Sequence, residues 1–80
     1  MKLLDVRSPQ EYREGHLPNS INVPLYELDE YIARGLLDRN SKIVVYCQSG
    51  IRSQQAVEML RKAGYRNVHN LEGGLDNLRR

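Results

Sequence analysis

Residues 43–53, "IVVYCQSGIRS", contain the only cysteine of the 80-residue chain. The first four residues are apolar and largely β-branched, a run typical of a strand buried on both faces of a sheet. The sequence from Ser53 onward, "SQQAVEMLRKAG", has helical periodicity and ends at Gly64, a common helix stop. The inward positions expected for this helix are Ala56, Val57, Leu60 and Ala63. The stretch therefore predicts a strand, a tight loop carrying Cys47, and a helix.

Strands and helices alternate along the rest of the chain. "KLLDV" (2–6) and "INV" (21–23) read as short strands, the second stopped by a proline, and "NVHNL" (67–71) as a last strand. "SPQEYREG" (8–15) predicts a helix in which Ser8 caps, Pro9 takes the first position and Glu11 completes a capping box. Gly15 is its expected end.

A second helix is predicted over 25–37, "LYELDEYIARGLL", and a helical turn over 75–80, "LDNLRR". The apolar stripe expected to face the core is Leu25, Leu28, Ile32 and Leu36. Strands that alternate with helices indicate an α/β fold with a mainly parallel sheet. The length suits one small domain, so residues 1–80 are expected to form a single domain.

Composition excludes several classes of function. The net charge of +2 is dispersed along the chain and argues against binding to nucleic acid or an anionic membrane. The Arg79–Arg80 tail is read as a solvated end. A lone cysteine cannot form an internal disulfide, and no Cys/His cluster has metal-ligand spacing, so no metal and no cofactor are expected. The reducing cytoplasm is the expected compartment, with an exported mature fragment left open.

The loop after Cys47 has the features of an anion-binding turn. Residues 48–52 reverse the chain within a few positions, and Gly50 supplies the conformational freedom. Successive amides in such a turn converge, and the helix starting near Arg52 or Ser53 adds unpaired N–H groups. These amides and a nearby guanidinium favour the thiolate. The alternative is that Cys47 is a small buried hydrophobe at a strand end.

Loop length separates two chemistries. Cysteine-dependent phosphatases place five residues between cysteine and arginine, whereas four, "QSGI", separate Cys47 from Arg52 here. The shorter ring is too tight for phosphate but has room for one added sulfur atom. Tyr46 also stands where those phosphatases usually carry a histidine. A phosphatase or arsenate reductase is therefore the weaker alternative.

The sequence resembles the rhodanese family of sulfurtransferases over nearly its whole length. "LLDVRSPQEYREGHLPNSINVPL" is similar to the family's first signature, "VVYCQSGIRS" to its active-site loop and "AGYRNVHNLEGGL" to its closing motif. The resemblance implies a rhodanese-like parallel sheet flanked by helices on both faces. It also implies that a sulfane sulfur passes from thiosulfate or another persulfide or polysulfide donor to cyanide or a thiol, through a persulfide on Cys47. A non-enzymatic sulfur carrier or binding module on the same fold is the other alternative.

The resemblance assigns roles to individual residues. Cys47 is the catalytic nucleophile, and Arg52 braces the loop and contributes positive potential. The residues expected to bind substrate are Gln48, Ser49, Gly50, Ile51, Arg52 and Ser53. Ser53 either caps the helix or hydrogen-bonds within the loop. The residues with expected structural roles are Asp5, Arg7 and Glu11 as a charge-paired framework, His16 in a loop, and Gly73 and Gly74 in a turn.

The chain also departs from the family pattern. Rhodanese domains usually have a strand and a helix before "LLDVR", so this sequence is similar to a minimal single-domain form. Without that strand, the expected order is "NVHNL", "IVVY", "LLDV", "INV", all parallel, and the exposed edge invites self-association. The loop has no basic residue besides Arg52, which makes thiosulfate a less favoured donor. Leu78 stands where the family often has an aromatic residue.

Overall fold

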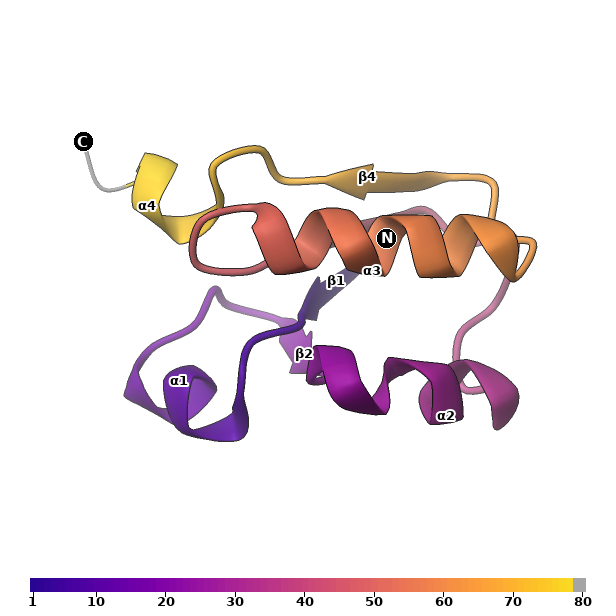
Figure 1. Ribbon diagram of the computed structural model, residues 1–80, viewed down its shortest axis with the longest axis horizontal. Coiled ribbons are helices and arrows are strands. Elements are labelled where there is room, and N and C mark those ends of the chain that lie inside the picture. The colour runs from indigo at the N-terminus through magenta and orange to yellow at the C-terminus, as the bar shows by residue number, and fades with distance from the viewer. Residues whose placement is uncertain (79–80) are drawn as a thin grey trace.

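The structure is a computed structural model that describes residues 1–78 and forms an α/β fold (Figure 1). The elements in chain order are β1 (Lys2–Asp5), α1 (Pro9–Glu14), β2 (Ser20–Asn22), η1 (Leu25–Glu27), α2 (Leu28–Ala33), β3 (Ile43–Tyr46), α3 (Ile51–Lys62), β4 (Val68–Asn70) and α4 (Gly74–Leu78). The predicted alternation of strands and helices is confirmed. The predicted Arg79–Arg80 tail lies outside the described residues.

The four strands form one parallel sheet in the order β2-β1-β3-β4. This is the order predicted from the sequence, with β4 at an edge beside β3. In the register of the central pair, Asp5 lies opposite Tyr46. The carboxyl ends of β1 and β3 therefore coincide, and the segments that follow them emerge side by side at one end of the sheet.

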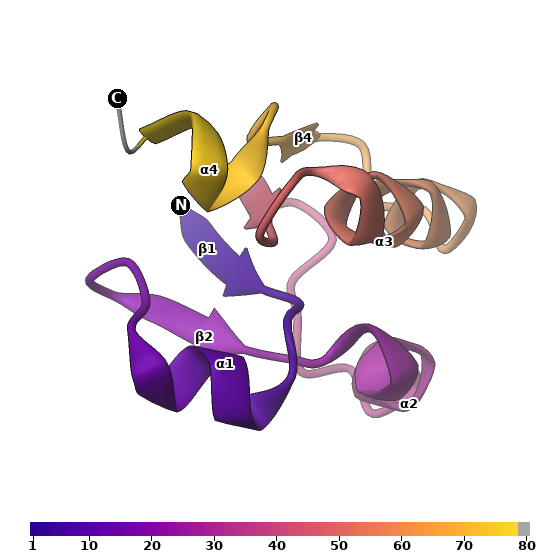
Figure 2. The same cartoon turned by 60° about the vertical axis from the view of Figure 1, so that its left-hand side comes forward.

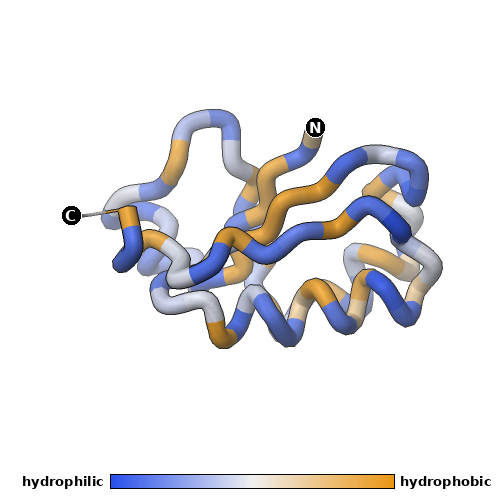
Figure 3. The backbone as a smooth tube through the Cα atoms, turned by 90° about the horizontal axis from the view of Figure 1, so that it is seen from above, coloured by the Kyte–Doolittle hydropathy of each residue, from blue (hydrophilic) through white to orange (hydrophobic). Residues whose placement is uncertain are grey.

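The hydrophobic core lies between one face of the sheet and helices α2 and α3, with the apolar stretches gathered in the central strands (Figures 2 and 3). The buried residues of this core from the strands include Leu4, Ile43, Val45 and Val68, and those from α3 are Ala56, Val57 and Leu60. Ala63 packs against this cluster while partly exposed. The inward face predicted for α3 is thus confirmed.

The second face of the sheet is less completely covered. Side chains alternate between faces along a strand, and Val44, which points away from the core cluster, is only half-buried. Ile21 on β2 is 36% exposed. The prediction that "IVVY" is buried on both faces is therefore wrong at Val44, because α2 and α3 pack on the opposite face.

Helix α1 begins and ends as the sequence predicts. The Ser8 hydroxyl accepts from the Glu11 amide, the Glu11 carboxylate accepts from the Ser8 amide, and Pro9 takes the first turn. The amide of Gly15 donates to the Tyr12 carbonyl at the other end. The capping box fixes the place of Glu11, which also contacts the cysteine loop.

The predicted helix over 25–37 is shorter than the pattern suggests. A 3-10 turn, η1, leads into α2, which ends at Ala33, and Gly35 then adopts a φ of +70°. The left-handed glycine breaks the helical stripe. Leu36 is consequently 54% exposed, whereas Leu37 is buried. The prediction that Leu36 faces the core is wrong for this reason.

The longest helix in residues 1–78 is α3, with 12 residues. Within this part of the chain, the helices lack the combination of length and apolar character needed to cross a bilayer.

Candidate active site

Cys47 follows β3 directly and lies at the carboxyl end of the parallel sheet, where α/β folds place their ligands. Gly50 has a φ of +100° and helix α3 starts at Ile51, slightly before the predicted position. This turn brings two backbone amides to the cysteine: N–H groups of Gly50 and Ser53 donate to Sγ over 3.1 and 3.4 Å. The predicted convergence of amides is present in the structure.

Hydrogen bonds around the thiol favour its ionised form. Burial of the Cys47 side chain raises its pKa, but hydrogen bonding with the Ser53 hydroxyl and donation from the amides of Ser53, Gly50 and Ser49 together outweigh it. The net effect is a pKa below the ordinary thiol value. This direction agrees with the prediction, and the hydrogen bonds to sulfur together are its cause.

Arg52 turns its guanidinium toward α1 and forms two hydrogen bonds with Glu11. Its Nη1 and Nη2 lie 2.7 and 3.0 Å from the two Glu11 carboxylate oxygens. Hydrogen bonding to Arg52 lowers the pKa of Glu11 to about 2, so this carboxylate is ionised at neutral pH. Arg52 does brace the loop, as predicted. Its positive potential at the thiol is reduced, however, because Glu11 neutralises it.

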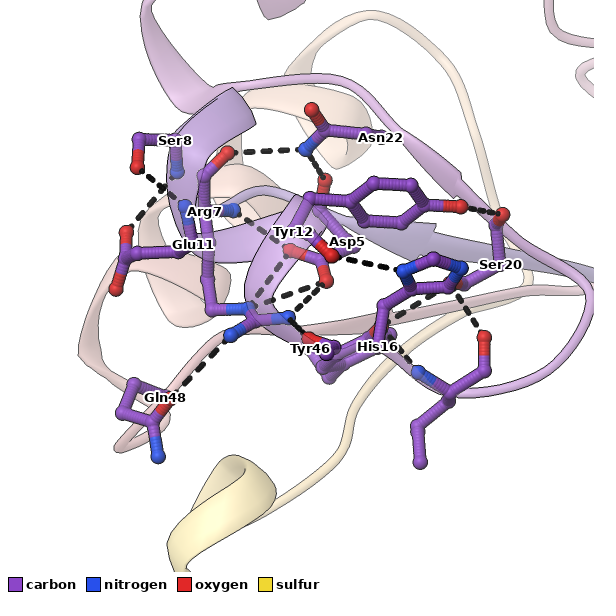
Figure 4. A network of polar contacts seen from close by, with 12 residues as sticks. Asp5, Arg7, Ser8, Glu11, Tyr12, His16, Ser20, Asn22, Tyr46 and Gln48 are labelled. Carbon is purple, nitrogen blue, oxygen red and sulfur yellow. Dashed lines mark hydrogen bonds and ion pairs between the residues drawn. The ribbon is translucent and has the colours of Figure 1, made fainter.

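A buried ion pair supports the loop from the end of β1 (Figure 4). Asp5 and Arg7 are 0% and 3% exposed, with Arg7 Nη2 2.8 Å from Asp5 Oδ2. The guanidinium also donates to the Gly15 carbonyl over 2.6 Å and to Gln48 Oε1 over 3.4 Å. The predicted charge-paired framework of Asp5, Arg7 and Glu11 is thus confirmed, with Asp5 paired with Arg7. The partner of Glu11 is Arg52, which the sequence did not indicate.

Gln48 points toward α4. Its Nε2 donates to Asp76 Oδ1 over 2.6 Å, which completes a chain from Arg7 through Gln48 to Asp76. The amide of Asp76 donates in turn to the Gln48 carbonyl over 3.0 Å. The Gln48 side chain is therefore held between two partners on one side of the loop, which the sequence does not indicate.

The glycine turn before α4 packs directly beneath the loop. Gly73 and Gly74 have φ values of +75° and +58°. A Cβ on Gly74 would overlap the Cys47 carbonyl and lie 2.7 Å from the Gln48 carbonyl. The amide of Leu75 donates to the Cys47 carbonyl over 3.1 Å. The predicted turn role of these glycines is confirmed, and its reason is the close approach of the two backbones.

Ser53 is fully buried and its hydroxyl lies within the site. Ser53 Oγ is 3.3 Å from Cys47 Sγ and 2.6 Å from Asn70 Oδ1. The helix cap is Gly50, without a side-chain cap bond, so of the two alternatives for Ser53 the structure selects the hydrogen bond within the loop. The sequence did not identify Asn70, which reaches the site from the end of β4. Its position near the carboxyl end of the predicted edge strand 67–71, just before the "EGG" turn, was the available signal.

The outer side of the loop borders an open hollow of about 500 Å³. Ser49, Gly50 and Ile51 line one part of it, and Ile51 is 71% exposed. Asn70 and Glu72 line the part beyond the loop. Three of the six predicted substrate-binding residues thus border this hollow.

Two further residues fix the surroundings of the loop. The Tyr46 side chain is fully buried, accepting from the Leu17 amide over 3.0 Å and donating to Ser20 Oγ over 3.1 Å. His16 stacks on Tyr12, with ring centroids 3.6 Å apart, and its Nδ1 lies 2.8 Å from the Tyr12 carbonyl. Both side chains contact other residues of the fold, which agrees with the expected role of His16 in fixing a loop.

Over residues 1–78, no group of three or more His, Cys, Asp or Glu side chains has an arrangement suited to a metal ion.

The fold and site define an α/β domain with a cysteine in an amide-lined loop at the end of a parallel strand. Residues 1–80 match the model of the rhodanese-like domain. The chain is 43% identical to the thiosulfate sulfurtransferase PspE of Escherichia coli K12, over 94% of this chain and 71% of that protein. It is 36% identical to a sulfurtransferase of Allochromatium vinosum, over 91% of this chain and 66% of the relative.

Solved structures agree. A rhodanese with anions from E. coli superposes with a TM-score of 0.84 at 42% identity, over 95% of this chain and 88% of that one. A rhodanese-like domain from an Anabaena protein gives a TM-score of 0.86 at 34% identity, over 95% and 86% of the two chains. The chain belongs to the rhodanese family.

Proposed function

We propose that this chain moves a sulfane sulfur between small molecules through a persulfide on Cys47. It is an enzyme of the thiosulfate sulfurtransferase type, as expected for this family and for relatives that carry that name. One observation supports Cys47 as the nucleophile: at the carboxyl end of β3, its Sγ accepts hydrogen bonds from two backbone amides. Donors so placed stabilise negative charge on sulfur.

The reaction proceeds in two displacements. In the first, the Cys47 thiolate attacks the outer sulfur of thiosulfate, the S–S bond of the donor breaks, and sulfite leaves with the bonding electron pair. In the second, cyanide or a thiolate attacks the outer sulfur of the persulfide. The Cys47 thiolate is then the leaving group and is regenerated with no net oxidation or reduction of the protein.

The loop residues Gln48 to Ser53 form the cradle in this proposal. Cys47 is fully buried, so the loop must move outward to admit the outer sulfur of the donor. Amides of the turn then surround the terminal sulfur of the persulfide, an anion for most of the cycle. Side chains matter less for this role, because Gln48 is bonded to Asp76 and Arg52 to Glu11.

A strong general base is unnecessary in this scheme, because the hydrogen-bond donors around Sγ favour the ionised form of the nucleophile. The nearby carboxylates fit that reading: Asp5 is buried against Arg7, and Glu11 is held ionised by Arg52. Phosphate monoester hydrolysis is less compatible with the site. It needs a cation on the transferred group, and Glu11 engages the guanidinium of Arg52.

The charge around the cradle bears on the donor. Both arginines near the loop, Arg7 and Arg52, are paired with carboxylates. A dianion such as thiosulfate therefore meets backbone amides rather than an unpaired cation, and we expect it to bind weakly. Persulfides of small thiols, which carry less charge on the reacting group, are the alternative donors that suit this site.

Intact-mass spectrometry tests the proposal directly. Brief thiosulfate treatment of the folded protein is expected to add one sulfur atom, which cyanide removes as thiocyanate. Cys47→Ser is the control and is expected to gain no mass. A parent protein that stays unmodified, while its Cys47 reacts with an alkylating agent, would contradict the proposal. Phosphate release from a generic phosphoester, measured in parallel, examines the phosphatase alternative.

The compartment and the assembly state are further proposals. The single free cysteine suits a reducing cytoplasm, and cell fractionation with an antibody tests this.

Strand β4 pairs on one side with β3, so its other edge is available for self-association. Light scattering at increasing protein concentration distinguishes a monomer from a dimer.

A further inference from the structure

The Ser53 hydroxyl has one proton and two candidate acceptors. Its Oγ lies 2.6 Å from Asn70 Oδ1 and 3.3 Å from Cys47 Sγ. A hydroxyl donates one hydrogen bond while accepting others through its lone pairs. When the proton points to Asn70, a lone pair of Oγ is free to face Sγ, an arrangement that suits the protonated thiol as donor. When it points to Sγ, the thiolate gains a donor and Asn70 loses one.

The orientation of the Asn70 amide is fixed by its other contacts. Its Nδ2 donates to the Gly50 carbonyl over 3.3 Å and to Gln54 Oε1 over 3.2 Å. A flipped amide would set Oδ1 against the Gly50 carbonyl, which has no proton to offer. Oδ1 therefore faces Ser53 and acts as an acceptor there.

We propose that Asn70 is a positioning residue of this site: it competes with Cys47 for the Ser53 proton and so sets how strongly the hydroxyl stabilises sulfur anions. The proposal rests on the proposed sulfur transfer, in which Cys47 is by turns an attacking thiolate and a leaving group. Too strong a donor at Sγ makes the thiolate a weaker nucleophile, because nucleophilicity falls as basicity falls. Asn70 weakens the hydrogen bond from the Ser53 hydroxyl to Sγ while Cys47 attacks. Rotation of that hydroxyl restores the hydrogen bond when the Cys47 thiolate is the leaving group.

Charged groups around the loop do not account for the proposed effect of Asn70 on the Cys47 thiolate. The charged residues that contact the loop, line the hollow beside it or pair with one of these are Arg52, Glu11, Arg7, Asp5, Glu72 and Asp76. Among the hydrogen bonds of residues 1–78, those of Cys47 Sγ and Ser53 Oγ involve only the loop, Ser53 and Asn70. The variants below leave all six of these charged residues in place.

The test is the pH dependence of Cys47 alkylation by iodoacetamide in the full chain. Asn70→Leu is nearly isosteric and removes the acceptor, so the hydroxyl becomes free to donate to the thiolate. The midpoint is expected to fall by roughly one pH unit, the size expected of one hydrogen bond to a charged group. Asn70→Ser, whose hydroxyl is too short to reach Ser53, is the second variant in case the apolar side chain disturbs the fold.

A double-mutant cycle with Ser53→Ala separates positioning from packing. In the Ser53→Ala background, substitution of Asn70 is expected to leave the alkylation midpoint equal to that of Ser53→Ala alone. An unchanged midpoint in folded Asn70 variants would overturn the proposal, as would an equal shift in the absence of the Ser53 hydroxyl. Because alkylation needs no sulfur donor, these results are independent of the persulfide test, which the proposed function must pass separately.

Discussion

Glu11 on α1 and Arg52 on α3 are joined by two hydrogen bonds of 2.7 and 3.0 Å across 41 residues of sequence. Glu11 also closes the capping box of α1 through the Ser8 amide. One carboxylate therefore fixes the start of a helix and holds the first turn of the helix that follows the cysteine loop. The contact links the first and second sequence motifs of the family in space.

Substitution of Glu11 is expected to change the acid stability of the fold. A pKa lowered from 4.5 to about 2 means that the pair stabilises the native state above pH 4.5, and that this contribution is lost as the pH falls toward 2. Solvent screening of a partly exposed pair limits the contribution to about 1 kcal/mol. Glu11→Gln should therefore lose less stability than the parent between pH 5 and pH 2.5, as measured by urea unfolding. Glu14→Gln, an exposed position on the same helix, is the control and should behave as the parent does.

Gly74 is expected to tolerate no side chain. Gly74 and Gly35 both have positive φ, +58° and +70°, but only the added Cβ at Gly74 would meet the loop carbonyls, since nothing lies within 4 Å of it at Gly35. Gly35→Ala should cost about 1 kcal/mol from backbone strain alone. Gly74→Ala should cost about 2 kcal/mol more through overlap and should displace the Cys47 loop. Thermal unfolding and thiocyanate formation measure both effects, and equal losses in the two variants would refute the steric explanation.

Local sequence signals predicted the elements and their order well. The capping box at Ser8 and Glu11, the run from Ile43 to Tyr46 and the glycine at position 50 each encode their structure within a few residues. The order of the strands came from the family resemblance and is confirmed. These features depend on neighbours in sequence or on a known topology, which is why they could be read in advance.

What the sequence left out depends on contacts between distant segments. Three such contacts are the pairing of Arg52 with Glu11, the hydrogen bond from Ser53 to Asn70 and the close approach of Gly74 to the Cys47 carbonyl. They join residues 41, 17 and 27 positions apart. Periodicity also failed at Leu36, where a left-handed glycine ended the helix before the stripe was complete. Neither propensity nor spacing carries information on such contacts.

The pKa of Cys47 should respond to its hydrogen bonds more than to Arg52. The alkylation midpoint of the folded protein is expected below the free thiol value of about 8.5, since hydroxyl and amide donors lower it. Ser53→Ala removes the hydroxyl and should raise the midpoint. Arg52→Gln should shift it less, because Glu11 already neutralises the guanidinium. The urea-unfolded protein gives the reference, and a folded midpoint at or above that reference would show that the loop does not stabilise the thiolate.

Loop length is expected to decide between sulfur and phosphate as the transferred group. The amides of Gly50 and Ser53 reach the same sulfur, at 3.1 and 3.4 Å, because only a short turn separates β3 from α3. A glycine inserted between Gly50 and Ile51 gives the five-residue spacing of a phosphatase loop and should move one amide away from Sγ. Donors act only when aimed at the developing charge, so most thiosulfate-to-cyanide activity should be lost. The fold should persist, since a surface loop accepts one more residue at small entropic cost.

A glycine inserted after Gly35, in an exposed turn, is the control and should keep the parent rate. Phosphatase activity need not appear, because Glu11 still holds Arg52. A folded loop-insertion variant that forms thiocyanate as fast as the parent would show that ring size does not select the substrate.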